Sequence, residues 1–249
     1  MKTNIFLFMS KQVLNIISNS FSKLLFEEER HIYTVDEKVL PSVSAMVKSH
    51  CIPFDELYWA KKEEQKGKES LQQVLEKWET KRNIATTNGT SVHVYAEKWW
   101  ERKDSIPQNN QQKAVKEFLE ELTATGRYSL LHTELQMYSE KYNYAGTCDL
   151  LMWDNLEDHA VIMDYKTNEE LDKQFGFLLE PFSYSANTAF NKYQIQLSYY
   201  QLILEEVNIE VKERFIIWLK HDGTYEVRPC FDFTNVLKDY LNININESN

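Results

Sequence analysis

The sequence predicts an α/β protein, in which stretches with a strand pattern alternate along the chain with stretches at helical spacing. Two apolar runs flank the polar residues 155–158, and this arrangement predicts a β-hairpin over 144–166. Helices are expected over 111–123 and 192–207. Of the 249 residues, 43% are hydrophobic, which is enough to build a sizeable core for this fold class.

The chain is long enough for one large domain or two small ones, and its sequence contains no recognisable linker. We therefore expect a helical N-terminal extension over 1–27 and a single domain over 28–249. No apolar run reaches the length of a membrane span. The cysteines Cys51, Cys148 and Cys230 are scattered, so they predict neither a disulfide framework nor a cysteine metal site, and they fit a reducing compartment.

The first 26 residues hold lysines, serines and apolar side chains but no acidic residue. This composition is expected of an amphipathic helix packed on the domain, or of a variable extension. The apolar run 5–9 is too short for a secretory signal, and the lack of arginine argues against a transit peptide. A strand hairpin is expected over 28–40, and Pro41 with Ser42 or Ser44 is typical of a helix start.

Residues 54–82 have a helical pattern rich in charge, and they include Trp59 and Trp78. One interpretation is a solvated helix face with its tryptophans in the core. The other is the wall of a channel in which lysines meet phosphates and an aromatic ring stacks on a base. Gly89 then predicts a break, followed by a second helix that runs through Trp100.

Strand alternation brings polar side chains together on the predicted hairpin. Asp164 and Lys166 project from one face of their strand, whereas Met163 and Tyr165 project from the other. Asp149 lies on the partner strand. Buried like charges are unfavourable unless a cation lies between them, and carboxylate oxygens suit magnesium or manganese.

A further strand is expected over 128–138, where alternation places His132, Glu134 and Gln136 on one face. The segment 167–184 is apolar but irregular, which favours a lid or a loop over a substrate channel. The remaining expected elements are strands over 213–220 and 225–231 and a closing helix over 234–241.

Four short motifs follow one another along the chain: Gly89-Thr90-x-x-His93, Gly146-x-x-Asp149, Asp164-x-Lys166 and Gln196-x-x-x-Tyr200. The ordered set, in helix, strand, strand and helix contexts, resembles the PD-(D/E)XK nuclease superfamily. Within it the likeness is to the RecB-type exonuclease branch, which includes phage and mitochondrial exonucleases. The resemblance implies a central twisted mixed β-sheet with helices on both faces.

The resemblance also implies a metal site for the hydrolysis of DNA phosphodiesters. Asp149 and Asp164 would hold one or two Mg²⁺ or Mn²⁺ ions, with His93 and the backbone carbonyl of Tyr165 as further ligands. Lys166 would orient the attacking water or offset developing negative charge. Its ordinary pKa of about 10.4 makes it a poor base at neutral pH.

Glu134 would hold a water of this site, and the helix residues Tyr193, Gln196 and Tyr200 would fix the scissile strand. An iron–sulfur cluster, which some relatives carry, is not expected, because it needs four cysteines. The expected partners are DNA, as a single strand or at ends, and a recombination or replication protein, but no membrane. The expected location is a bacterial or phage-infected cytoplasm, ahead of the mitochondrial matrix.

The formal net charge of −10 is unusual for a protein that acts on nucleic acid, so this function requires a local basic strip. Two other functions stay open. One is a structure-specific endonuclease, and the other is a non-cleaving DNA-binding or recombination module on the same scaffold.

Overall fold

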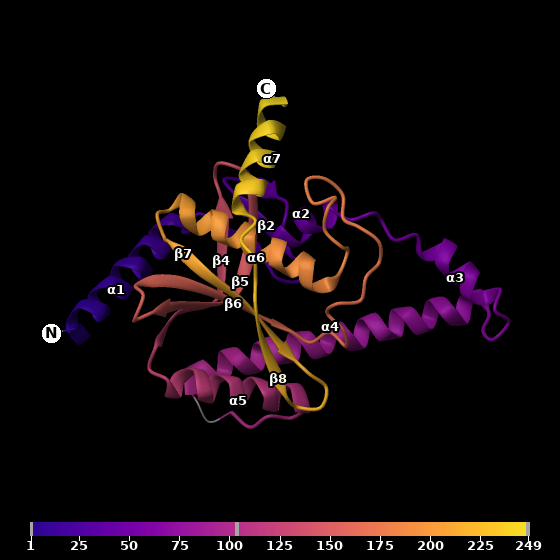
Figure 1. The fold of residues 1–249 in the computed structure, drawn as a ribbon, viewed down its shortest axis with the longest axis horizontal. Coiled ribbons are helices and arrows are strands. Elements are labelled where there is room, and N and C mark those ends of the chain that lie inside the picture. Colours follow the sequence, from indigo (N-terminus) through magenta and orange to yellow (C-terminus); the bar gives the residue numbers. More distant parts are fainter. Residues whose placement is uncertain (1, 103–104, 248–249) are drawn as a thin grey trace.

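A five-stranded mixed β-sheet forms the centre of the computed structural model, which describes residues 2–102 and 105–247 (Figure 1). Neighbouring strands pair antiparallel except for the third and fourth, which are parallel and are joined by the crossover helix α6 (Ala189–Glu206). The α/β prediction is therefore confirmed. In spatial order the strands are β4 (Tyr128–Ser139), β5 (Tyr144–Asp154), β6 (His159–Lys166), β7 (Val211–Leu219) and β8 (Tyr225–Pro229).

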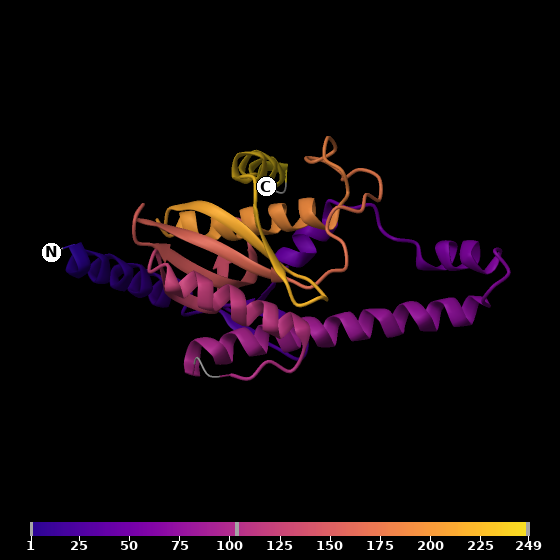
Figure 2. The same ribbon diagram turned by 60° about the horizontal axis from the view of Figure 1, so that its bottom comes forward.

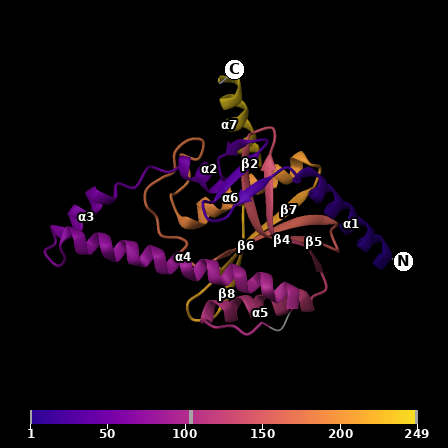
Figure 3. The same ribbon diagram turned by 180° about the vertical axis from the view of Figure 1, so that it is seen from behind.

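A small antiparallel sheet lies against the N-terminal end of β5 (Figure 3). The Ala145 backbone N–H donates a hydrogen bond of 3.0 Å to the Pro41 carbonyl, which ties the two sheets together. The small sheet confirms the hairpin predicted over 28–40. Its strands are β1 (Leu25–Glu27), β2 (Ile32–Val35) and β3 (Lys38–Leu40). Ser42 then caps α2 (Val43–Ser49), as its sequence context predicts.

Helices cover both faces of the central sheet (Figure 2). Helices α2, α6 and α7 (Thr234–Glu247) lie on one side, and α4 (Leu71–Arg102) and α5 (Asn110–Ala124) lie on the other. Successive residues of β6 point to opposite sides, because Val161 packs in the cluster with α5 and Ile162 packs in the cluster with α6.

Helix α4 corrects the prediction of a break at Gly89, because it runs unbroken from Leu71 to Arg102. Gly89 keeps a helical backbone, and a Cβ there would meet only Thr167 Oγ1 at 3.7 Å. The helix predicted over 54–82 is instead interrupted earlier, between α3 (Glu56–Glu64) and α4. The cause is Gly67, which takes a φ of +75° and closes the turn.

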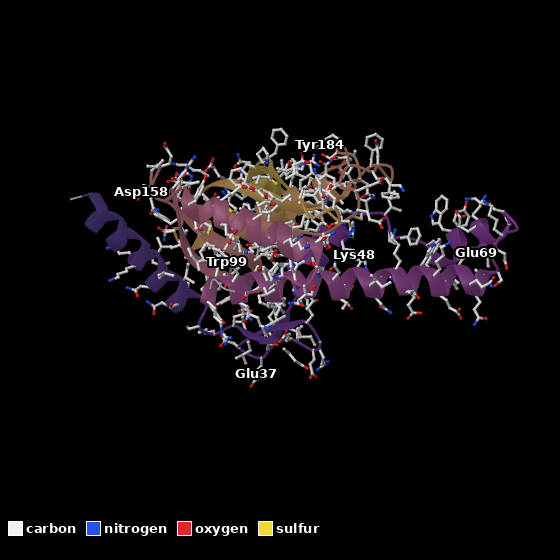
Figure 4. All side chains as sticks on the ribbon, turned by 90° about the horizontal axis from the view of Figure 1, so that it is seen from below. Glu37, Lys48, Glu69, Trp99, Asp158 and Tyr184 are labelled. Atoms are coloured by element: carbon white, nitrogen blue, oxygen red, sulfur yellow. The ribbon has the colours of Figure 1, made fainter. Side chains whose placement is uncertain are left out.

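The N-terminal half of α4 extends beyond the sheet, and α3 folds back along it (Figure 2). We call the residues of α3 and the first half of α4, 56–85, the helical arm. Glu69, in the turn of this arm, and Asp158, in the β5–β6 turn, lie at opposite ends of the molecule (Figure 4).

The segment between β6 and α6 is anchored to the core although it is irregular. Leu171, Leu178 and Phe182 are buried in the cluster that also contains α6. Phe175 and Tyr184 are exposed. This pattern agrees with a predicted loop, whose position is fixed by its buried side chains.

The two ends of the chain also pack on the core. Helix α1 (Lys2–Ser20) contributes Val13 and Ile17 to the main hydrophobic cluster. The closing helix α7 continues to Glu247, beyond the predicted end at 241, because no glycine or proline follows Leu241. Strand β8 is shorter than predicted, since it ends at Pro229. None of the described helices is long and apolar enough to cross a membrane.

Candidate active site

The β5–β6 hairpin brings two acidic residues to the centre of the sheet. Asp149 and Asp164 are both buried, and the backbone N–H of Tyr165 donates a hydrogen bond of 2.9 Å to Asp149 Oδ2. Leu150 pairs with Met163 in the antiparallel hairpin. The same register places Asp149 opposite Asp164. The hairpin prediction is confirmed, with its turn at 155–158.

Helix α4 and strand β4 add two more side chains to this point. His93 Nδ1 lies 3.1 Å from Glu134 Oε1 and 3.5 Å from Asp149 Oδ2. Glu134 reaches inward from a distorted part of β4, where a bulge follows Leu130 and Glu134 itself has a φ of +47°. Ligand atoms of His93, Glu134 and Asp149 all lie within 4.8 Å of one another.

Lys166 lies beside the acids on the face predicted from alternation, and its ammonium group pairs with the Asp164 carboxylate. The same ammonium lies 4.6 Å from the centre of the Tyr193 ring. The Tyr193 hydroxyl in turn donates a hydrogen bond of 2.7 Å to Asn168 Oδ1. These contacts hold the Lys166 side chain in one position.

Burial and the charges of neighbouring groups shift the pKa values of the ionisable side chains in this site. Burial raises the pKa of Asp149, and burial together with the Asp149 charge raises the pKa of Asp164 to about 6. Burial works against protonation of His93, but the Asp149 and Glu134 carboxylates outweigh it and raise the His93 pKa to about 9. Burial likewise opposes the charge on Lys166, yet Asp164 and Asp149 raise its pKa. Lys166 is therefore held as a cation.

The donor set fits a divalent cation. Asp164 Oδ1 is buried and has no hydrogen-bond partner among the residues that the structure describes. One imidazole and three carboxylates offer nitrogen and hard oxygen ligands around it, and a cation there would relieve the repulsion between the acids. His93, Asp149 and Glu134 form the tightest cluster, and Asp164 is partly neutralised by Lys166.

Helix α6 borders the site with the two residues of the fourth motif. Gln196 Nε2 donates a hydrogen bond of 2.9 Å to the Tyr200 hydroxyl. Both residues line a cavity of about 210 Å³ that also reaches His93 and Glu134. The sequence motifs therefore meet in space, although they are spread over more than a hundred residues.

A second, larger cavity of about 710 Å³ also reaches His93 and extends to Lys166. The helical arm forms one wall, and the segment 167–193 forms the other. We call this cavity the arm groove. Its basic side chains are Lys81, Lys166, Lys173 and Lys192, and acidic Glu169 and Glu170 also line it. No sequence motif marks Lys173 or Lys192, because only the folded loop brings them into the same cavity as the arm.

Together the mixed sheet and its buried cluster of acids, histidine and lysine define an α/β protein with a candidate site for a divalent cation. A family model described as the PD-(D/E)XK nuclease superfamily matches residues 46–225 of the chain, and the chain belongs to this superfamily. Members of the superfamily use divalent metals.

No curated protein matches the sequence. A solved structure titled "Crystal structure of SSO0001" is 12% identical, with 96% of this chain and 86% of that chain covered and a TM-score of 0.38.

Proposed function

We propose that this protein is a metal-dependent deoxyribonuclease that acts as an exonuclease on single-stranded DNA or on DNA ends. The observation that carries the proposal is the meeting of His93, Glu134 and Asp149 beside the Asp164–Lys166 pair. Superfamily membership supports the nuclease class. The RecB-type branch, and with it a setting in replication, recombination or repair in a bacterial or phage-infected cytoplasm, rests on the resemblance of the four motifs.

In this proposal Asp149, His93 and Glu134 would hold the cation, and Asp164 and the Tyr165 carbonyl would be its further ligands. A bound Mg²⁺ or Mn²⁺ supplies Lewis-acid activation of water and neutralises charge on the scissile phosphate. The backbone N–H of Tyr165 fixes Asp149 Oδ2, so this carboxylate is oriented before the substrate binds.

Lys166 acts as an electrostatic and positioning group in this scheme. Because the Asp164 and Asp149 carboxylates raise its pKa, we assign Lys166 as an ammonium group and not as a neutral base. Its ammonium is held by Asp164 and lies over the Tyr193 ring, at the edge of the arm groove. From there it can stabilise negative charge that develops on the phosphate.

The substrate strand has a basic route to this point despite the net charge of −10. Lys173 and Lys192 line the arm groove, where they can contact phosphates, and Lys81 can do so when it leaves its 2.8 Å ion pair with Glu169. Gln196 and Tyr200 border the smaller cavity, which shares His93 with the arm groove. We propose that the DNA strand crosses the site between these two cavities.

The central test is the alanine substitution of single site residues. Asp149→Ala and Lys166→Ala are each expected to lower magnesium-dependent release of nucleotides from labelled linear single-stranded DNA by on the order of 100-fold or more. Glu157→Ala, on the exposed hairpin turn, is the matched control and should retain full activity. Full turnover by the folded Lys166→Ala protein would contradict the proposal.

Circular single-stranded DNA distinguishes an exonuclease from a structure-specific endonuclease, because only an endonuclease can cut a strand that has no end. An intact circle beside a digested linear strand supports the exonuclease. Binding of both substrates without any metal-dependent cleavage would instead identify a non-cleaving DNA-binding module.

A further inference from the structure

A second cluster of polar side chains lies at the far end of the β5–β6 hairpin. It consists of Asp154 at the end of β5, His159 at the start of β6 and Glu213 on β7. Asp154 is five residues from Asp149, so the two clusters are separated by roughly 16 Å along the strand. The cluster adjoins the hairpin turn that contains Asp158, at the end of the molecule away from the helical arm (Figure 4).

His159 is arranged as a metal ligand normally is. Its Nδ1 lies 3.3 Å from the carbonyl oxygen of Glu157. A carbonyl oxygen can only accept, so Nδ1 carries the proton, and in the neutral ring the lone pair is on Nε2. His159 is 3% exposed, and its Nε2 has no hydrogen-bond partner in the part of the chain that the structure describes.

The Nε2 atom faces another acceptor. Glu213 Oε2 lies 3.5 Å from His159 Nε2, and it too is buried without a hydrogen bond among the described residues. Two acceptors that face each other in a buried position repel unless a proton or a metal cation lies between them.

The third side chain is already oriented. Asp154 Oδ1 accepts hydrogen bonds from the backbone N–H groups of Leu156 at 2.8 Å and Glu157 at 3.2 Å. Arg127 Nε donates to Asp154 Oδ2 at 2.7 Å, and Arg127 Nη2 lies 3.5 Å from Glu213 Oε2. Arg127 Nη2 also lies 2.5 Å from Asp154 Oδ2, so the guanidinium neutralises one of the two carboxylate charges and leaves the other for a further cation.

We propose that Asp154, His159 and Glu213 form a second metal site, for a divalent transition metal such as Zn²⁺. The ligand atoms of all three residues lie within 4.8 Å of one another. One imidazole nitrogen and two carboxylates suit Zn²⁺ better than Mg²⁺, and three protein ligands leave a fourth position for water. Two carboxylates outnumber the single guanidinium of Arg127, so a dication is electrostatically favoured there.

The site is structural in this proposal, because it connects three parts of the fold. Asp154 and His159 flank the hairpin turn, Glu213 belongs to the parallel neighbour strand, and Arg127 immediately precedes β4. A metal ion bound only by the folded chain would raise its stability by mass action.

The test is the Zn²⁺ content of chelator-treated protein after reloading and desalting. The wild-type chain is expected to hold one equivalent more than His159→Gln or Glu213→Gln, whatever the catalytic cluster binds. Glu210→Gln, an exposed carboxylate three residues away, is the matched control and should load like the wild type. An Asp149→Asn variant should keep the additional equivalent, which separates this site from the catalytic one.

Thermal unfolding gives a second measurement. Zn²⁺ at about 100 times its dissociation constant should raise the wild-type melting temperature by about 5–10 °C, and it should raise that of Glu213→Gln by less. If His159→Gln does not fold by circular dichroism, the half-buried Glu213→Gln decides. Equal Zn²⁺ content in wild type and Glu213→Gln would overturn the proposal and would identify a proton, in place of a metal, between Nε2 and Oε2.

Discussion

Gly146 of the second motif is required by packing. A Cβ at this position would lie 2.7 Å from Tyr200 Cε1 and 2.9 Å from Val43 Cγ2. The Gly146→Ala substitution is therefore expected to lower the free energy of unfolding by about 1–3 kcal/mol and to displace the Tyr200 ring. Urea denaturation followed by tryptophan fluorescence measures the loss.

Gly89 provides the contrasting control, although it too belongs to a motif. It lies within α4, and a Cβ would make only an ordinary contact with Thr167 Oγ1. Gly89→Ala should therefore leave the free energy of unfolding unchanged or raise it by about 0.5–1 kcal/mol. A loss equal to that of Gly146→Ala would mean that the helix does break at Gly89.

The charge on His93 links metal binding to pH. With its pKa raised to about 9 by Asp149 and Glu134, His93 stabilises the metal-free fold fully below its ordinary pKa of about 6.5. This contribution is lost as the pH rises through about 9. A cation that binds Nδ1 must displace the proton, so metal affinity should increase between pH 7 and pH 9.

Calorimetry of Mn²⁺ binding checks this expectation for His93. Proton release should appear as a dependence of the heat on the ionisation enthalpy of the buffer, and His93→Gln should abolish that dependence. Mn²⁺ binding that releases no proton at pH 7 would show that His93 does not bind the ion.

At the scale of elements, hydrophobic periodicity predicted the strands and helices that build the site. Alternation correctly placed Asp164 and Lys166 on one face of β6, because the strand is buried on both sides and has a fixed register. The same reasoning failed at Gly89, since tertiary packing overrides the weak helix propensity of one glycine. For 167–184 it predicted only an irregular lid or loop, because the path of this segment depends on contacts with distant residues.

The arm groove is accordingly a feature that only the folded structure reveals. Lys173 comes from the irregular segment and Lys192 from α6, and they line the same cavity as Lys81 of the arm. The combined substitution of Lys173→Glu and Lys192→Glu should weaken binding of a single-stranded oligonucleotide. It should also reduce the slope of log affinity against log salt by about 0.7 for each phosphate that a lysine no longer neutralises.

Fluorescence anisotropy at several salt concentrations measures both effects on oligonucleotide binding. A control with the same change in net charge is Lys116→Glu with Lys141→Glu, because neither residue lines the arm groove. If the control weakened binding equally, the effect would come from the net charge of the molecule, and the groove would not be the route of the strand.

At the scale of the whole molecule, the N-terminal helix α1 is part of the main hydrophobic core. The sequence predicted a helical extension over 1–27, either packed on the domain or variable, because the first 26 residues contain no acidic side chain. In the structure Val13, Ile17 and Phe21 lie in the same cluster as α6 and the central sheet. The apolar spacing of the three residues was readable in the sequence, but the surface they cover is formed by strands more than a hundred positions away.

We therefore expect α1 to unfold together with the domain. Ile17→Ala should lower the free energy of unfolding by about 2–4 kcal/mol, because it leaves a cavity at a buried position of α1. Asn15→Ala, on the exposed face of the same helix, should change it by less than about 0.5 kcal/mol. Urea unfolding followed by both far-ultraviolet circular dichroism and tryptophan fluorescence should give one coincident transition that shifts as a whole in Ile17→Ala. A separate early transition of the helical signal, with the fluorescence midpoint unmoved, would instead make α1 an independent extension.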